Sequence, residues 1–95
     1  MPQHEDAHAA SQIDEVRSAL LAFVTRSFMV NEADIDRDRS LIDQGVIDSF
    51  GLVEITAFIF QHFEVEVREE DMTREAFGSL NKMARFVARR MREHA

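Results

Sequence analysis

Residues 41–50 read LIDQGVIDSF and lead directly into the apolar segment GLVEITAFIF at residues 51–60. The spacing of apolar residues in the second segment predicts a helix that begins at Ser49, so this serine stands where a loop becomes a helix. Asp48 comes just before it, and Gly45 allows the loop to turn shortly upstream. This short stretch therefore sets a single serine at the start of an apolar helix.

Two interpretations of Ser49 follow from its place in the sequence. As a plain N-cap it would satisfy free amides at the helix start, and its replacement by alanine would cost about 1 kcal/mol. A cap, however, needs neither the preceding Asp48, nor Gly45, nor the flanking apolar residues. This context favours a modification site, and a helix N-terminus suits an attached phosphodiester because its free amides and positive dipole end attract the phosphate.

Catalysis by Ser49 is not expected, because a catalytic serine needs a base within reach. The histidines are His4, His8, His62 and His94. His62 lies nearly four turns further along the same helix, at about 1.5 Å per residue. The chain also lacks a G-x-S-x-G elbow and a glycine-rich phosphate loop. The sequence therefore predicts a protein that is not an enzyme.

No metal site is expected either. Asp36, Asp38 and Ser40 have the spacing of the first ligands of an EF-hand, but Leu41 replaces its glycine and Ile47 its final glutamate. His4 and His8 share one helix face without a third ligand nearby.

The composition indicates one cytoplasmic domain. Ninety-five residues suffice for one core but not for a roomy active site, and the chain has eight phenylalanines and no cysteine. The lack of cysteine agrees with a reducing compartment. The N-terminus does not read as a signal peptide, and no apolar run approaches the roughly 20 residues that span a bilayer.

Charge is unevenly distributed along the chain. Residues 1–78 carry 17 acidic and 6 basic side chains, whereas residues 79–95 carry one acidic and five basic ones. An acidic surface is a poor match for nucleic acid and a better one for a basic partner protein. The arginines near the end of the last predicted helix are accounted for by its dipole.

Residues 1–11 are polar and predict a flexible tail before a domain at residues 12–95. Ser11 is the expected N-cap of a first helix that runs to about Phe28. A long polar loop follows, with Ile35 and Leu41 as its expected anchors. The inward face of the first helix is expected to consist of Ile13, Val16, Leu20, Phe23, Val24 and Phe28.

The second half predicts three further helices. After the helix from Ser49, FEVEVREED is expected to be an extended connector, because a lone strand has no partner. Thr73 should cap a short helix that Gly78 closes in a left-handed conformation, and Ser79 should cap the last helix. The fold class is therefore an all-α four-helix bundle, with three longer helices, one short helix and a long loop between the first two. The inward residues are expected to be Leu52, Ile55, Thr56, Ile59 and Phe63, then Leu80, Met83, Ala84, Val87 and Met91.

The segment SLIDQGVIDSFGLVEI, residues 40–55, resembles the attachment motif of acyl carrier proteins and their peptidyl and aminoacyl relatives. In that family, the serine of an Asp-Ser pair receives 4′-phosphopantetheine from coenzyme A. The resemblance covers nearly the whole chain and implies that Ser49 is the attachment point and Asp48 its acidic neighbour, which assists the transferase's metal-bound site. It also implies partner-binding positions at Phe50, Val53, Glu54 and Ala57.

The function that this resemblance implies is that of a monomeric carrier. It would hold an acyl or aminoacyl group as a thioester, in fatty acid or secondary metabolite biosynthesis. Its partners would be a phosphopantetheinyl transferase, an acyl- or amino-acid-activating ligase, and a downstream acyltransferase or synthase. The alternative is an unmodified helical adaptor that docks through the apolar surface of the second helix, including Phe60.

Several departures from the housekeeping carriers narrow the subgroup. Gly45 stands one residue further from Ser49 than is usual, Phe50 replaces a leucine, and the second helix has few acidic residues, which favours dedicated partners. GVIDSFGLV and TREAFGSLNKM are similar to D-alanyl carrier proteins, and an aminoacyl carrier and a specialised acyl carrier stay equally open. Gly51 costs about 1 kcal/mol inside a helix; its small size is expected to let the arm or an enzyme backbone approach.

Overall fold

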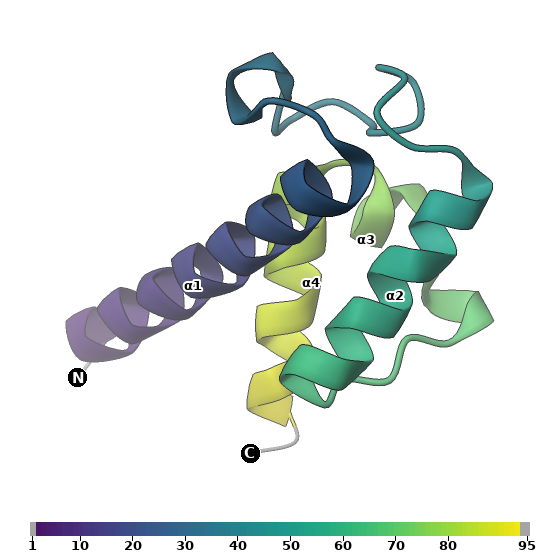
Figure 1. The fold of residues 1–95 in the computed structure, drawn as a ribbon. Helices are drawn as coiled ribbons and strands as arrows, with labels where there is room; N and C mark the ends of the chain where they lie inside the picture. The colour runs from purple at the N-terminus through teal and green to yellow at the C-terminus, as the bar shows by residue number, and fades with distance from the viewer. Residues whose placement is uncertain (1, 94–95) are drawn as a thin grey trace.

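The computed structural model describes residues 2–93, with the side chains of residues 10–93. These residues form four α-helices and two single-turn 3-10 helices, which confirms the predicted all-α architecture with one short helix (Figure 1). A long loop joins the first two α-helices, as expected. In chain order, the elements are α1 (Pro2–Phe28), η1 (Glu32–Asp34), α2 (Ser49–Phe63), η2 (Glu69–Asp71), α3 (Arg74–Phe77) and α4 (Leu80–Glu93).

The core forms where α1, α2 and α4 meet, and α1 packs most extensively against α4. Every inward position predicted for these helices is buried or packed against the core, except Thr56, which is only half-buried. The loop anchors Ile35 and Leu41 are also buried. The largest fully buried side chains are Val16, Leu20, Val24, Leu41, Ile55, Ile59, Leu80, Met83 and Val87.

The start of α1 differs from the sequence-based expectation. The helix begins at Pro2, so Ser11 lies inside it and is not an N-cap. Proline is well suited to the first position of a helix. An amide hydrogen there would have no acceptor within the helix, so proline loses no hydrogen bond by lacking one. The division of the chain into a tail at residues 1–11 and a domain at residues 12–95 stays a prediction.

The ends of α3 and the start of α4 agree with the sequence in part. Thr73 caps α3 by accepting from the Ala76 amide at 3.2 Å, and Ser79 caps α4 by accepting from the Lys82 amide at 3.1 Å. Gly78 was expected to be left-handed, but its φ is −74°. A glycine is needed there for another reason, because a Cβ would collide with the carbonyl oxygen of Arg74.

The predicted connector at residues 63–71 is extended in its middle part, whereas Phe63 belongs to α2 and Glu69–Asp71 forms η2. Glu64 ends the helix in a left-handed conformation, with φ of 57°. Val65 then points into the core at 2% exposure, and Val67 packs partly against it. The connector therefore spans from α2 to η2 as extended chain, with alternate apolar side chains docked on the bundle.

Candidate functional site

Ser49 is the first residue of α2 and is exposed. The N-cap is Asp48 rather than the serine: its backbone is extended, and its Oδ1 accepts a hydrogen bond from the Gly51 amide at 2.9 Å. In the described part of the chain, the Ser49 hydroxyl makes no hydrogen bond. Asp48 therefore performs the capping that the plain interpretation had given to Ser49, and the serine hydroxyl projects freely at the positive end of the helix.

The loop that leads to Ser49 is held by its own backbone. Gly45 has φ of 78°, a conformation that side chains disfavour, and it reverses the chain as expected from the sequence. The amides of Val46 and Ile47 then both donate to the carbonyl of Leu41, at 2.9 and 3.3 Å. Because Leu41 and Ile47 are buried, the two residues before Asp48 are fixed to the core.

Gln44 braces the earlier half of this loop, a role that the sequence did not reveal. Its Oε1 accepts from the Asp36 amide at 3.0 Å, and its Nε2 donates to the carbonyls of Asp36 and Arg39 at 2.9 and 3.1 Å. One side-chain amide thus replaces backbone pairing across the loop. This bracing gives a segment without regular structure a defined path to the helix start.

Asn81, in the first turn of α4, ties the same loop to the bundle. Its Oδ1 accepts from Nε of Arg17 at 2.6 Å, its Nδ2 donates to Oδ1 of Asp38 at 2.7 Å, and its amide donates to the carbonyl of Arg37 at 3.0 Å. A single side chain therefore links α1, the loop and α4. Its place in the sequence, far from its partners, gave no signal of this role.

Gly51 is buried, which corrects the expectation that its small size leaves room for the arm or an enzyme. A Cβ built there would lie 2.8 Å from the Ile47 Cβ and 3.1 Å from Cε1 of Phe28. Such distances are far inside van der Waals contact. The glycine therefore allows α2 to pack closely on the loop and on the end of α1.

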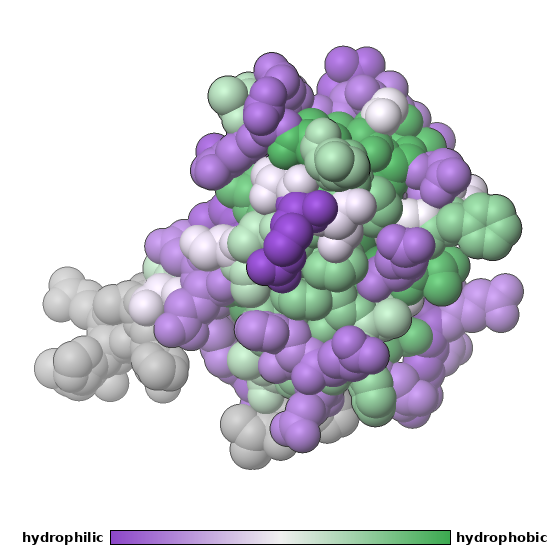
Figure 2. Space-filling model, viewed as in Figure 1, coloured by the Kyte–Doolittle hydropathy of each residue, from purple (hydrophilic) through white to green (hydrophobic). Residues whose placement is uncertain are grey.

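The residues expected to contact partners all lie exposed on α2. Phe50 is 79% exposed and Val53 57%, while Glu54 and Ala57 are exposed too. Together with Phe60 at 58%, the apolar members follow a spacing of three and four residues along one face. The space-filling view shows apolar surface over α2, interrupted by polar side chains (Figure 2). An exposed apolar stripe therefore begins next to Ser49.

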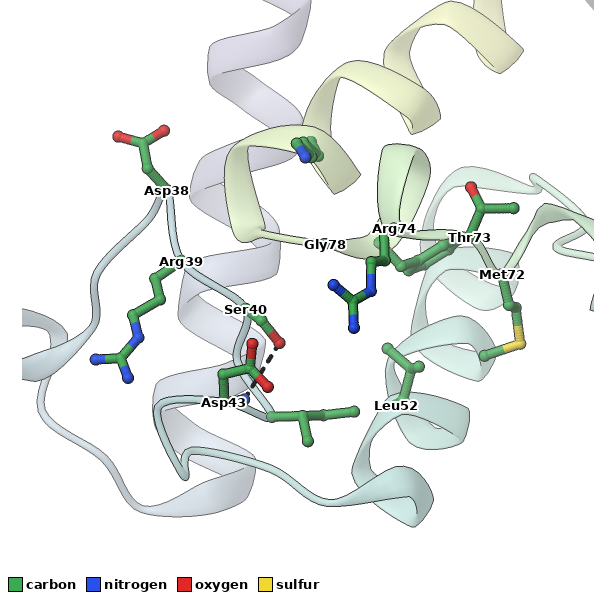
Figure 3. A pocket seen from close by; sticks show the side chains of 12 residues that line it. Asp38, Arg39, Ser40, Asp43, Leu52, Met72, Thr73, Arg74 and Gly78 are labelled. Carbon is green, nitrogen blue, oxygen red and sulfur yellow. Dashed lines mark hydrogen bonds between the residues drawn. The ribbon is translucent and has the colours of Figure 1, made fainter.

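A pocket of about 550 Å³ lies between the loop, α2 and α3 (Figure 3). Leu52 contributes its wall from α2, and Arg74 extends from α3 toward Ser40 and Asp43 of the loop. Ser49 and Leu52 are three residues apart and so share a side of the helix. The pocket therefore lies within one helical turn of the serine, which does not itself line it, and has both apolar and charged walls.

An ion pair holds the η2 side of this pocket in place. Arg90 of α4 and Asp71 of η2 meet at 3.0 Å, with side chains 23% and 16% exposed. The hydrogen bond from Arg90 lowers the pKa of Asp71 below its usual value, and Asp71 in turn raises the pKa of Arg90. Met72 and Thr73, which follow Asp71 directly, line the pocket. The pair therefore positions the pocket wall.

The exposed Ser49 hydroxyl is available as the attachment point of a group. No base lies within hydrogen-bond reach of Ser49 in the described residues, and the same residues contain no cluster of three metal-ligating side chains. An exposed hydroxyl at a helix N-terminus does fit a phosphate ester, because the dipole favours negative charge there. The residues present thus suit an attached phosphopantetheine group.

Comparisons with known proteins agree with this geometry. Residues 18–87 match the family described as "Phosphopantetheine attachment site". The D-alanyl carrier protein of Streptococcus mutans is 30% identical over 69 residues, which cover 73% of this chain and 86% of that protein. The D-alanyl carrier protein of Streptococcus uberis is 33% identical over 72 residues, covering 76% of this chain and 90% of that protein. In addition, no helix in residues 2–93 has the length and apolar character needed to cross a membrane.

Proposed function

We propose roles for individual residues of this chain. The starting point is that the chain belongs to the phosphopantetheine-binding carrier proteins, the family that its sequence matches over most of its length. The protein is a non-catalytic carrier and a substrate of a phosphopantetheinyl transferase. Its covalent 4′-phosphopantetheine supplies a terminal thiol that holds acyl or aminoacyl groups as thioesters. The unmodified adaptor is not favoured.

Ser49 is the residue that receives the arm in this proposal. Its Oγ attacks the phosphorus that carries pantetheine in coenzyme A, and the P–O bond of the pyrophosphate breaks. Adenosine 3′,5′-bisphosphate leaves, and the serine proton passes to the transferase. The observation that carries the assignment is the exposed, unengaged hydroxyl at the start of α2, held there because Asp48 caps the helix. Oδ2 of Asp48 makes no hydrogen bond within the described chain and can face the transferase.

Intact mass measurement tests this assignment. The protein is incubated with coenzyme A, magnesium and a promiscuous phosphopantetheinyl transferase, and we expect the wild type to gain one arm. The Ser49→Ala variant should gain none, while Ser18→Ala, which changes another exposed serine on α1, should gain one. An arm on the Ser49→Ala variant would show that another residue is modified.

The cargo proposed for the arm is an amino acid of the kind named by its relatives, D-alanine. The support is the similarity to two D-alanyl carrier proteins. Loading of the holo protein by a D-alanine-activating ligase with ATP should exceed loading by a fatty-acyl ligase. The reverse preference would place the chain among specialised acyl carriers instead.

Phe50, Val53, Glu54 and Ala57 are proposed to contact the transferase, the ligase and a downstream acyltransferase or synthase. Their exposure on α2 beside Ser49 supports this role. Because Val53 is 57% exposed, Val53→Glu should slow transfer of the amino acid without unfolding the protein. Ala22→Glu, at an exposed position of α1, should leave the transfer rate unchanged. If Val53→Glu transfers the amino acid as fast as Ala22→Glu does, the exposed face of α2 does not contact these partners.

We also propose that the carrier works as a cytoplasmic monomer and that residues 1–11 are dispensable for it. The family match begins at residue 18, and the core lies beyond residue 12. Removal of residues 1–11 should therefore leave arm attachment intact. Loss of attachment in the shortened, folded protein would assign these residues to the domain.

A further inference from the structure

We infer that the outer face of α4 is a second docking surface, which binds an acidic segment of a partner protein. Lys82, Arg85, Arg89 and Arg92 are all exposed and follow a spacing of three, four and three residues. This spacing places them along one side of the helix, over about 15 Å of its length. We call these four residues the basic stripe.

The helix dipole accounts for the arginines near the end of α4, as expected from the sequence, but not for the basic stripe as a whole. The dipole favours cations in the last turn of α4, whereas Lys82 lies in the first turn, where a positive charge is unfavourable. Neighbouring like charges three and four residues apart are also destabilising. The stripe therefore opposes the stability of its own helix at one end and along its length.

Internal ion pairs do not explain it either. Within the described chain, none of the four residues makes a salt bridge, although Arg90 on the same helix pairs with Asp71. Arg85 uses its Nε for the carbonyl of Asn81 at 3.3 Å, which holds its side chain along the helix. One α4 arginine thus serves the fold, and the stripe presents its charges outward.

The surface beside the stripe is hollowed. Lys82, Arg85 and Arg89 line a pocket of about 290 Å³ together with Phe86 and Glu75. Lys82 also lines the pocket between the loop, α2 and α3, so the stripe begins at the wall of that pocket. A segment lying along α4 would therefore reach the wall of that pocket.

Charge and shape favour an acidic polypeptide over other anions. The apolar face of α4 is buried in the core, so the helix has nothing to insert into a membrane. The net charge of −7, with 17 acidic side chains in residues 1–78, repels extended polyanions such as lipid surfaces and nucleic acid. A helix with carboxylates at the same spacing matches the stripe and avoids the acidic remainder.

The test uses the holo protein and a synthetic helical peptide of about 18 residues, with glutamates spaced to match the stripe. Peptide binding is followed by fluorescence anisotropy at low and high salt, and the contact is mapped by amide chemical shifts. Three comparison probes are used: the same peptide with lysines, vesicles of phosphatidylglycerol and phosphatidylcholine, and single-stranded DNA. We expect the acidic peptide to bind best and to shift amides of residues 82–92.

The stripe is then altered in Lys82→Glu/Arg85→Glu/Arg89→Glu, with Arg26→Glu on α1 as the matched control. We expect affinity for the acidic peptide to fall by about tenfold or more in the triple variant and to stay unchanged in the control. Lys82→Gln/Arg85→Gln/Arg89→Gln serves if the reversed variant does not fold, as judged by circular dichroism. An unchanged affinity in the folded variant would overturn the inference.

Other outcomes also decide against it. Tighter binding of vesicles or DNA than of the acidic peptide would assign the stripe to that ligand, and salt-sensitive self-association in light scattering would assign it to a second copy of this chain. Arm attachment at Ser49 is measured on the same variants and should be unaffected. A protein that accepts no arm contradicts the proposed carrier function, whereas loss of the α4 contact alone contradicts only this inference.

Discussion

Gly51, whose side chain is a single hydrogen atom, allows close packing near the attachment serine. We expect Gly51→Ala to destabilise the protein by about 1–3 kcal/mol, because its new methyl group overpacks the contact with Ile47 and Phe28. Alanine would otherwise stabilise a helix interior by about 1 kcal/mol relative to glycine. Urea unfolding measures which effect dominates. A more stable variant would mean that the loop moves aside at little cost, and that packing does not require the glycine.

The different roles of Asp48, which caps α2, and Ser49, whose hydroxyl stays unengaged, are also decided at the residue scale. The sequence predicted that α2 starts at Ser49, and this is confirmed, but it could not decide which of two adjacent capping residues makes the bond. Aspartate and serine are both good N-caps, so the choice depends on the backbone path of the loop. That path is set by the buried neighbours Leu41 and Ile47, which belong to the tertiary structure.

Among the elements, η2 is attached to α4 by the Asp71–Arg90 pair, and this attachment should depend on pH. The Arg90 hydrogen bond lowers the folded-state pKa of Asp71 below 3.8, its value when unperturbed. The pair therefore stabilises the fold fully above that pH and loses its contribution as the pH falls through the lower, folded-state pKa. We expect Asp71→Asn to cost about 1–3 kcal/mol at neutral pH, with the difference from wild type shrinking below about pH 4.

Denaturant unfolding across this pH range measures the effect. Glu70→Gln is the matched control, because Glu70 is exposed and only approaches Arg68 at 3.8 Å. It should change stability little at any pH. A difference between wild type and Asp71→Asn that stays constant into acid would show that the pair is not what links η2 to α4.

Asn81 makes the corresponding link between the long loop and the bundle. Asn81→Ala removes the bonds to Arg17 and Asp38, and we expect a loss of about 1–2 kcal/mol with faster amide exchange in the loop around Asp38. Lys82→Ala, in the same turn, should leave loop exchange unchanged. Equal exchange in both variants would mean that Gln44 and the buried anchors alone hold the loop.

At the scale of the whole molecule, the sequence predicted the helices and their inward faces because apolar spacing is a local signal. It also indicated Ser49 from its neighbours. What it missed are contacts between distant segments: Gly51 against Phe28, Asn81 against Arg17, and Arg90 against Asp71. The alignment of four basic residues was visible in the sequence, but only the burial of the opposite face of α4 shows that it is an outer surface.

The exposed site and the buried core should make carrier activity and stability separable. Ser49→Ala removes no cap and no described contact, so its free energy of unfolding should stay within about 0.5 kcal/mol of wild type, although the variant accepts no arm. Ile55→Ala leaves a cavity at a residue with 0% exposure and should cost about 2–5 kcal/mol, while its folded fraction still accepts the arm. Urea unfolding and intact mass, measured on the same samples, compare the two. Loss of stability in the serine variant, or loss of arm attachment in folded Ile55→Ala, would mean that the site and the core are coupled, and that the bundle does more than present the serine.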